Sequence, residues 1–269
     1  MTNAEIKRIA ELKERKAREE QARFLIEGKR AIIEALTNGT SIERILINIA
    51  VDSSKLAEIY SLAEGCGFPI DEIPATRFNK LVSTGTSQGI VAVAKIASIT
   101  FDRIVDKIRS KKDTLIIILD RISDPGNLGT ILRSASWFGV DAVMIGDGSV
   151  DIYNPKVVRS AMSAISNVNV VQEIILIEAI TTLKSFGFTI IASSQNGKKN
   201  YAFYNFPRRS CLILGSEATG IDKKTLDVCD ETVMIPRIGE MESLNVGVAG
   251  SIILAEIMQQ RMRSLSTHL

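Results

Sequence analysis

The second half of the chain carries short, almost entirely apolar runs that are separated by longer segments of mixed character. Runs of this kind are typical of parallel strands that are covered on both faces. They predict strands at five places, namely 114–120, 142–146, 189–194, 211–215 and 232–236. Apolar residues at helical spacing predict helices between and after these strands, at 128–138, 154–166, 176–186 and 243–263. We therefore expect an α/β domain built around a parallel sheet.

The first hundred residues contain shorter elements. Apolar runs predict strands at 24–28, 42–48 and 89–96. Between them, residues 29–39 and 53–67 predict helices that end at glycines, which tolerate the left-handed conformation found at helix ends. The pattern indicates a small α/β unit.

The remaining segments lie before and after this small unit. Good helix formers without Gly or Pro predict one charged amphipathic helix at 4–23. Residues 98–113 predict a connecting helix or linker. We predict four parts of the chain, with boundaries at 1–22, 23–98, 99–113 and 114–269.

The rare residues argue against several kinds of chemistry. The one histidine, His268, lies next to the C-terminus, where a catalytic base or zinc ligand would not be held in place. Three widely spaced cysteines form no C-x-x-C pair, and their apolar neighbours predict buried thiols in a reducing cytoplasm. No run has the ~18 apolar residues of a membrane span, and the N-terminus lacks a signal-peptide core. The sequence predicts a soluble, cytoplasmic protein that holds no metal.

The charged residues are divided unevenly although their totals nearly balance. The whole chain has 33 basic and 31 acidic side chains, which by itself does not indicate a nucleic-acid partner. Residues 1–112 carry 19 basic and 15 acidic side chains, whereas residues 113–269 carry 14 and 16. The first part therefore has a net charge of +4 and the second part −2.

Three polar, glycine-containing loops follow predicted strands of the second half, within residues 120–139, 212–222 and 235–257. Ligands bind at the carboxyl edge of parallel sheets, which is where such loops meet. Each loop taken alone also fits an ordinary turn, a helix cap or tight packing of small residues. The second is neither a Walker A loop nor a G-x-G-x-x-G dinucleotide loop.

Polar side chains in these loops are candidates for chemistry. We expect Asn127 to cap the helix that follows the first loop, and Arg133 to lie near the same anionic ligand, because its planar fork holds phosphate well. In the second loop, Gly215 and Gly220 would let backbone amides approach a ligand. In the third, Ser243 is expected to cap the last long helix.

The order and spacing of the loops are more specific than any one of them. They read N-L-G-T-I-L-R, then L-G-S-E-A-T-G, then I-P-R-I-G-E-M-E-S-L-N-V-G-V-A. Together they resemble the three signature motifs of the SpoU/TrmH family of SPOUT RNA ribose methyltransferases. The segments F-L-I-E-G-K-R-A-I-I-E-A-L and S-Q-G-I-V-A-V-A resemble the substrate-binding domain that precedes the catalytic domain in many members. The resemblance covers nearly the whole chain, and residues 1–22 are its least distinctive part.

This resemblance implies a fold and its partners. The parallel sheet would end in a trefoil knot, an exception to the rule that chains are unknotted. It would be preceded by a small, ribosomal-protein-like α/β domain that binds RNA. The resemblance also implies a homodimer through the knotted domain, S-adenosyl-L-methionine held by the knot loops, and RNA as substrate. Large-subunit ribosomal RNA is the first choice, because the two-domain layout resembles that of ribosomal RNA-modifying members.

The implied reaction is methyl transfer from S-adenosylmethionine to a ribose 2′-hydroxyl. The family motifs place the catalytic group at Asn127, Arg133, Ser243 and Asn245. They place the cofactor among Leu214, Gly215, Glu217, Gly220, Ile235, Ile238 and Leu244. Arginine is normally protonated, so we expect Arg133 to orient the phosphate and ribose of the target, and to accept the proton of the hydroxyl only in a special local setting. We expect Glu217 to organise its loop or to contact the partner subunit, and Arg159, Lys29 and Arg30 to contact RNA.

Two positions depart from the family pattern. Gly247 stands where the third motif usually has a second serine, which removes a hydroxyl and is expected to loosen the start of the last helix. Ser163 stands where a glycine is usual. The sequence leaves three alternative functions, namely a transfer RNA ribose methyltransferase, a non-catalytic RNA-binding or ribosome-assembly protein, and a nicotinamide-dependent oxidoreductase. The retained motif residues argue against the second, and the missing dinucleotide loop argues against the third.

The uneven charge predicts that RNA affinity resides mainly in residues 1–112. We expect binding to weaken steeply with added salt, because basic side chains displace counterions from the phosphates. Filter binding of the whole chain and of residues 113–269 to one RNA, over a series of salt concentrations, would measure this. Equal affinity of the two would contradict the prediction.

Overall fold

The computed structural model describes residues 1–83, 88–97 and 99–266. The predicted terminal His268 and the first residue of the S-Q-G-I motif, Ser87, lie outside these residues. Contacts between Cα atoms divide the chain into two units, one comprising Met1–Ala97 with Asp151–Asn167, the other Ser98–Val150 with Val168–Leu269. This division differs from the predicted boundaries, because a segment from within 114–269 packs with the first unit.

The first unit begins with two short helices where one continuous helix was predicted. They are α1 (Asn3–Ala10) and α2 (Arg15–Gln21), with a 3-10 turn, η1 (Glu11–Lys13), between them. The prediction of one helix over 4–23 is wrong because Glu14 adopts an extended conformation, with φ −90° and ψ 138°. Thr2 and Glu5 form a capping box at the start of α1.

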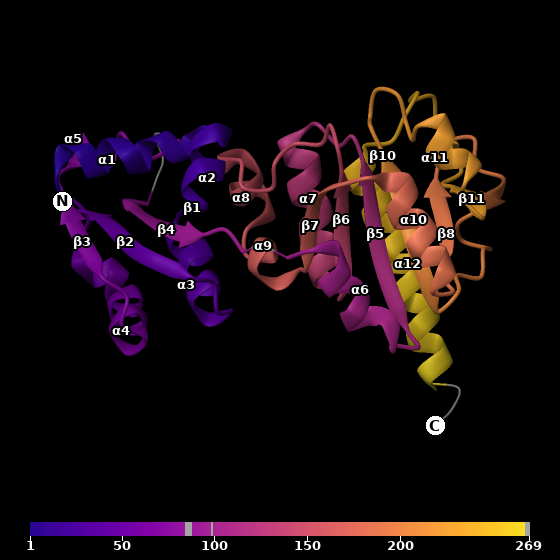
Figure 1. Ribbon diagram of the computed structural model, residues 1–269, viewed down its shortest axis with the longest axis horizontal. Helices are drawn as coiled ribbons and strands as arrows, with labels where there is room; N and C mark the ends of the chain where they lie inside the picture. The colour runs from indigo at the N-terminus through magenta and orange to yellow at the C-terminus, as the bar shows by residue number, and fades with distance from the viewer. Residues whose placement is uncertain (84–87, 98, 267–269) are drawn as a thin grey trace. The chain divides into compact units, whose positions relative to one another are not determined.

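A four-stranded sheet forms the centre of this unit, in the order β1-β4-β2-β3 (Figure 1). Strands β1 and β2 run antiparallel to β4, and β3 runs parallel to β2. The strands are β1 (Arg23–Glu27), β2 (Ile42–Asn48), β3 (Ile70–Ile73) and β4 (Ile90–Lys95). The connecting helices are α3 (Lys29–Thr37), η2 (Ser53–Leu56), α4 (Ala57–Cys66) and α5 (Ala75–Phe78).

The segment Asp151–Asn167 joins this unit through a buried ion pair. The guanidinium of Arg18 is 2.6 Å from Oδ2 of Asp151 and also donates to the carbonyl oxygens of Leu12 and Lys13. The side chains of Arg18 and Asp151 are 3% and 13% exposed. The segment forms α8 (Pro155–Ala161) and α9 (Ala164–Asn167). The predicted single helix over 154–166 is therefore wrong, because Met162 has a positive φ of 53° that no α-helix accepts.

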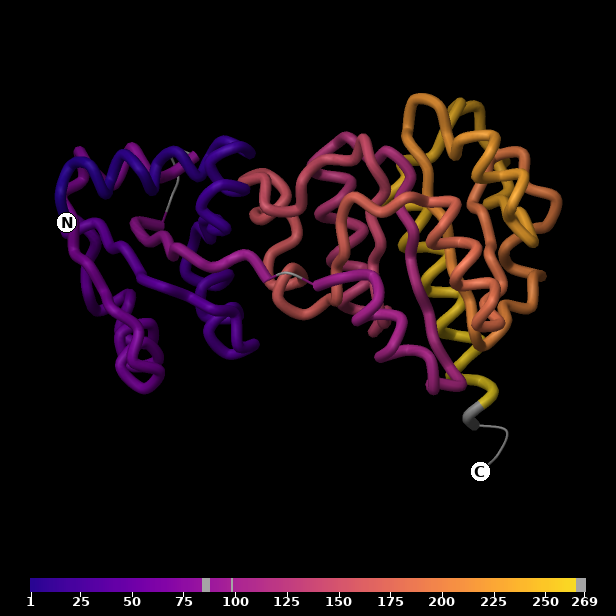
Figure 2. The backbone as a smooth tube through the Cα atoms, viewed as in Figure 1, coloured from indigo at the N-terminus to yellow at the C-terminus, as the bar shows by residue number. Residues whose placement is uncertain are grey.

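The second unit contains a seven-stranded sheet, in the order β7-β6-β5-β10-β8-β11-β9, in which every strand pair among the described residues is parallel. Figure 2 traces the backbone through these strands and the helices that connect them. Its strands are β5 (Thr114–Asp120), β6 (Ala142–Gly146), β7 (Val170–Ile174), β8 (Thr189–Ser193), β9 (Lys199–Asn200), β10 (Arg209–Gly215) and β11 (Glu231–Met234). All five predicted apolar runs are strands, which confirms the parallel α/β fold. The knot remains a prediction of the family resemblance.

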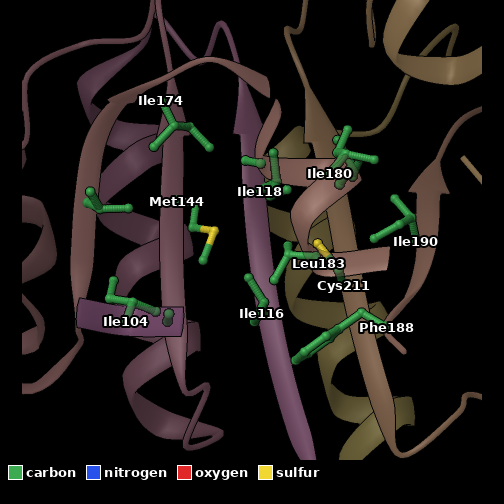
Figure 3. Packing of buried hydrophobic residues seen from close by; sticks show 14 of the residues in the cluster. Ile104, Ile116, Ile118, Met144, Ile174, Ile180, Leu183, Phe188, Ile190 and Cys211 are labelled. Carbon is green, nitrogen blue, oxygen red and sulfur yellow. The ribbon is translucent and has the colours of Figure 1, made fainter. Parts of the chain in front are cut away.

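Helices cover both faces of this sheet. They are α6 (Phe101–Arg109), α7 (Pro125–Trp137), α10 (Leu176–Ser185), α11 (Lys223–Asp227) and α12 (Val246–Ser266). Residues of α6 and α10 pack with Ile116, Ile118 and Met144 in one buried cluster (Figure 3). On the opposite face α12 lies against Leu214 of β10 and packs along α7. Every residue of β5 is buried, as the apolar run predicts.

The cysteines only partly follow the prediction of buried thiols. Cys211 is buried in the cluster, and its burial raises the pKa of its thiol. Cys229 is partly buried, and burial raises the pKa of its thiol to about 11. Cys66 is exposed, so the prediction is wrong there. It is the last residue of α4, directly before the glycine that ends the helix.

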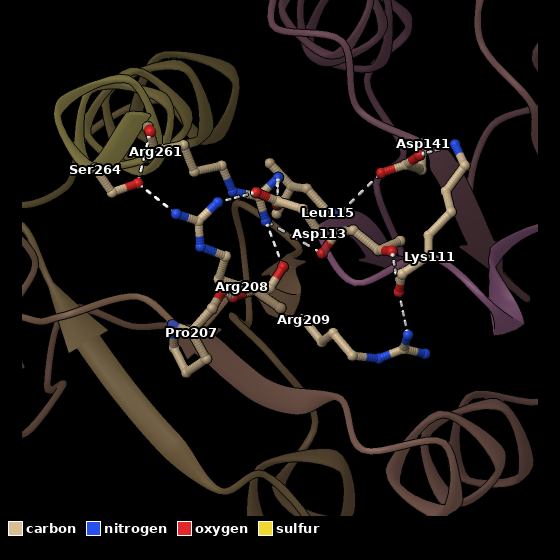
Figure 4. A network of polar contacts seen from close by, with 11 residues as sticks. Lys111, Asp113, Leu115, Asp141, Pro207, Arg208, Arg209, Arg261 and Ser264 are labelled. Carbon is tan, nitrogen blue, oxygen red and sulfur yellow. Dashed lines mark hydrogen bonds and ion pairs between the residues drawn. The ribbon is translucent and has the colours of Figure 1, made fainter. Parts of the chain in front are cut away.

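A polar network ties the C-terminal helix to the start of β5 (Figure 4). The carboxylate of Asp113 pairs with Arg208 and Arg261, each at 2.8 Å. Arg261 of α12 also donates to the carbonyl oxygens of Thr114 and Arg208. Nearby, Asp141 accepts from Lys111 Nζ and from the backbone N–H of Leu115, at 2.7 and 2.9 Å. This network lies at the amino ends of the strands, opposite the edge where the three motif loops lie.

The buried ion pair predicts a large effect of one substitution. In Arg18→Met the carboxylate of Asp151 would lose its cation while remaining mostly buried, so we expect the free energy of unfolding to fall by about 3–5 kcal/mol. Denaturant titration would measure the loss. Arg15→Met on the same helix is the matched control, because Arg15 pairs with Glu19 at the surface, where ion pairs contribute about 0–1 kcal/mol. Equal losses would contradict the assigned role of Arg18.

Candidate active site

The first motif loop runs from the end of β5 into α7. Asp124 caps this helix, because its side chain accepts a hydrogen bond of 2.8 Å from the backbone N–H of Asn127. Pro125 fills the first helical position, where its missing N–H costs nothing. The prediction that Asn127 is the cap is therefore wrong. It lies one turn further in, and its side chain is available for other partners.

The side chain of Asn127 joins the other two motif loops. Its amide Nδ2 donates to Oε1 of Glu217 in the second loop. Its Oδ1 accepts a hydrogen bond of 2.7 Å from Nδ2 of Asn245 in the third loop. Asn127 is thus hydrogen-bonded to residues 90 and 118 positions further along the chain, and the three side chains form one hydrogen-bonded chain. We call Glu217, Asn127 and Asn245 the amide chain.

Asn245 also starts the last helix. Its Oδ1 accepts from the backbone N–H groups of Gly247 and Val248, at 3.0 and 3.2 Å. The prediction that Ser243 caps α12 is wrong for this reason, since Asn245 does so. Ser243 is exposed in the loop before the helix. One amide group thus ends the amide chain and begins α12.

Small residues let α12 approach α7 and β10. A Cβ atom on Gly247 would lie 3.1 Å from Cβ and Cγ2 of Thr130, and one on Gly250 would lie 2.7 Å from Cδ1 of Leu214. The hydroxyls of Ser134 and Ser251 form a 2.6 Å hydrogen bond between the two helices. The missing side chain at Gly247 permits this close packing, and the expectation that it loosens the helix start stays a prediction.

Arg133 is separated from the amide chain. It is exposed on α7, and within the described part of the protein no hydrogen bond or ion pair of its side chain is recorded. Six residues correspond to about 240° around a helix, so Arg133 and Asn127 project from different faces of α7. The two side chains could share a ligand only if it extends around the helix.

The second motif loop folds back on its own first residue. Gly220, with a φ of +67°, donates its backbone N–H to the carbonyl oxygen of Ser216 at 2.8 Å. A Cβ atom on Gly215 would lie 2.4 Å from the backbone nitrogen of Ile221. Only glycine fits at this approach of the chain's own backbone, and the predicted approach of a ligand to Gly215 and Gly220 stays a prediction. The fold-back leaves Glu217 exposed and directed to Asn127.

The predicted cofactor residues differ in exposure. Leu214 is buried and Ile235 is partly buried, whereas Ile238 is 100% exposed and Leu244 is 47% exposed. Met241, between the last two, is 79% exposed. An apolar group of this size is rarely left in water without a partner or ligand. The third loop therefore has exposed apolar side chains that are suited to contact a ligand or a partner.

The three predicted RNA-contact residues have partners within the first unit. Arg159 lies 3.6 Å from Glu27, Lys29 lies 3.5 Å from Glu58, and Arg30 lies 3.0 Å from Glu34. The side chain of Glu27 is only 5% exposed, so Arg159 compensates a nearly buried charge. These geometries give each residue a structural role, and contact with RNA stays a prediction.

Sequence reasoning missed two residues at this edge of the sheet, Asp120 and Arg121. Asp120 is the last residue of β5 and is 1% exposed, and Arg121 follows it with a positive φ of 56°. An acidic residue that ends an entirely apolar run, followed directly by arginine, is the signal that could have found them. Within the described residues, no group of three or more His, Cys, Asp or Glu side chains could hold a metal, and no helix is long and apolar enough to cross a membrane.

Comparison with known proteins shows which families the two parts of the chain resemble. Residues 114–255 match the SpoU rRNA methylase family, and residues 3–92 match the MRM3-like substrate binding domain. A protein of Staphylococcus epidermidis, named for the TrmH family of tRNA/rRNA methyltransferases, is 31% identical over 240 residues, which cover 88% of this chain and 96% of that protein.

Two solved structures are similar in fold to this protein over nearly the whole chain. An RNA 2′-O ribose methyltransferase is 29% identical with a TM-score of 0.82, covering 97% of each chain. The SpoU methyltransferase AviRb of Streptomyces viridochromogenes, in complex with AdoMet, is 25% identical with a TM-score of 0.87, covering 97% of this chain and 99% of that one.

The fold and its joined loops define an α/β methyltransferase domain of the SPOUT class, preceded by a substrate-binding domain. The chain belongs to the SpoU rRNA methylase family. This confirms the resemblance inferred from the three motifs.

The close approach at Gly215 predicts a local loss of stability. In Gly215→Ala the new Cβ would meet the backbone of Ile221 at 2.4 Å, so the loop must shift. We expect the free energy of unfolding to fall by roughly 1–3 kcal/mol. Gly239→Ala is the control, because a Cβ there meets nothing within 4 Å, and its effect should stay within about 0.5 kcal/mol. Similar losses in both variants would contradict the interpretation.

Proposed function

We propose that this protein transfers the methyl group of S-adenosylmethionine to a ribose 2′-hydroxyl of RNA, with ribosomal RNA as substrate. The observation that carries the proposal is the amide chain, because it joins the three motif loops in the family's order at one edge of the sheet. The related structures named for 2′-O ribose methylation and for AdoMet binding support the reaction type and the cofactor.

The residues present suit such a cofactor. The fold-back leaves residues 217–220 of the second loop exposed, and the third loop offers Ile238 and Leu244 as apolar contacts. Leu214, Glu217, Gly220 and Ile235 complete the predicted set. Bound S-adenosylmethionine would supply an activated methyl group on a sulfonium. The amide chain would then fix the separation of the loops that hold it.

The polar residues around this edge would position the RNA. Arg133 is charged and exposed, and its planar fork suits a phosphate of the target strand. Ser243 is exposed beside Asn245 and would hydrogen-bond the ribose. Correct placement of the hydroxyl can supply a large part of the rate, because the methyl group is already activated.

The first unit would hold the rest of the RNA. The name of the SpoU rRNA methylase family and the presence of a substrate-binding domain before the catalytic domain support ribosomal RNA rather than transfer RNA. We also propose a homodimer in the cytoplasm. Large apolar side chains exposed on α7 and α12, namely Trp137 at 85% and Met262 at 65%, support a second copy against this pair of helices.

Tritiated S-adenosylmethionine and total RNA from a strain lacking the gene would test the proposal. We expect label in 2′-O-methyl nucleosides of ribosomal RNA after complete nuclease digestion. If label appears only in transfer RNA, then transfer RNA and not ribosomal RNA is the substrate. Absence of transfer to any RNA, with RNA binding retained, would instead support a non-catalytic RNA-binding protein.

Arg133→Lys tests whether the planar fork is needed. We expect methyl transfer to fall by about 100-fold or more, since lysine keeps the charge but loses bidentate binding. The dissociation constant for S-adenosylmethionine should not change. Arg103→Lys on α6, which is also exposed, is the control and should retain full activity. Full activity of Arg133→Lys would contradict a role specific to the guanidinium.

A further inference from the structure

A carboxylate is buried at the end of β5, beneath the second motif loop. Asp120 is 1% exposed, and β10 places Gly215 directly beside it in the sheet. A buried charge is costly unless it is paired and hydrogen-bonded. The donors that surround Asp120 therefore show what this carboxylate holds in place.

The loop itself supplies one of these donors. Oδ2 of Asp120 accepts a hydrogen bond of 2.7 Å from the backbone N–H of Asp222, which is the second residue after Gly220, where the fold-back closes. The Asp222 side chain in turn caps α11 by accepting from the N–H of Lys224. Asp120 thus fixes the point at which the loop ends and α11 begins.

Arg121 completes the arrangement from the next position. Its Nε donates to Oδ1 of Asp120 at 2.9 Å, and its Nη2 lies 3.4 Å from the carbonyl oxygen of Gly220. The bond to Asp120 raises the pKa of the guanidinium. The side chain can turn back in this way because Arg121 has a φ of +56°, which L-residues rarely adopt. Gly148 makes room, since a Cβ there would lie 3.2 Å from Cγ of Arg121.

These contacts act on the loop that carries Glu217. The loop is held at its start by the approach of Ile221 to Gly215, and at its end by Asp120 and Arg121. Glu217 lies between these two points and is the first member of the amide chain. Loss of the Asp120 carboxylate would release the end of the loop while leaving every motif residue in the sequence.

We propose that Asp120, with Arg121, is a positioning residue for cofactor binding, which it supports by holding the second motif loop in its folded-back shape. This inference rests on the proposed function, because it takes S-adenosylmethionine as the ligand of that loop. Asp120 itself is covered by the loop and would touch neither cofactor nor RNA.

The test compares the buried carboxylate of Asp120 with that of Asp141, which is 14% exposed and lies directly before β6 at the opposite edge of the sheet. Asp120→Asn replaces one of the two oxygens that accept from Asp222 and Arg121 at the carboxyl edge by an NH2 group, so that only one donor keeps its acceptor. Asp141→Asn makes the same change to the two oxygens that accept from Leu115 and Lys111 at the amino edge. Calorimetric titration with S-adenosylmethionine gives the dissociation constant. Thermal unfolding of each variant gives its stability, and peptide-level hydrogen exchange gives the opening of residues 216–222.

We expect Asp120→Asn to raise the dissociation constant about tenfold or more, the effect of losing a hydrogen bond to a charged group. Hydrogen exchange in 216–222 should become faster. Asp141→Asn should leave both unchanged within about twofold, even where it lowers the thermal midpoint equally. An unchanged dissociation constant in Asp120→Asn, or an equal rise in Asp141→Asn, would overturn the proposal.

A second variant, Arg121→Asn, tests the same proposal if Asp120→Asn does not fold. Arg121→Asn keeps a residue that tolerates positive φ and removes the guanidinium, so it should also speed exchange in 216–222 and weaken binding. Unchanged exchange and binding would overturn the proposal. If the wild-type protein binds no S-adenosylmethionine, the proposed function fails. The exchange rates then still show whether Asp120 holds the loop.

Discussion

The amide side chain of Asn127 is the interaction on which the candidate site depends. It is held within the first turn of α7, donates to Glu217 and accepts from Asn245. An asparagine amide has both donors and acceptors, so one side chain can bind a carboxylate on one side and an amide on the other. An aspartate could not donate to Glu217. The site therefore requires an amide where its three loops meet.

The packing of α12 makes this junction possible. Asn245 can meet Asn127 only if α12 begins close to α7, and the contact of Gly247 with Thr130 allows that distance. Glycine within a helix costs up to about 1 kcal/mol relative to alanine, so close approach is the compensating gain. A serine at 247 would need Thr130 to shift.

The local pattern of apolar residues was sufficient to predict most strands of the second unit. It was not sufficient where a contact between residues far apart in the sequence determines where a helix begins or ends. The five continuous apolar runs became strands, whereas β7 was missed because Gln172 and Glu173 interrupt its pattern. The predicted helix over 4–23 fails because the helix breaks at Glu14, just before Arg18 turns to Asp151, 133 residues away. The motifs identified the loops correctly. They could not show that Asn245, and not Ser243, caps the last helix, because both residues are good caps.

The structure also changes what the charge distribution means. Transfer of residues 151–167 to the first unit gives that unit 16 basic and 14 acidic side chains, and leaves 17 of each in the second unit. Division of the sequence at residue 112 gave net charges of +4 and −2 for the two parts, whereas the two units of the structure have net charges of +2 and 0. The difference arises from α6 and its flanks, where residues 99–112 hold five basic and two acidic side chains and belong to the catalytic unit. The net positive charge of the first unit is therefore smaller than the division at residue 112 implied.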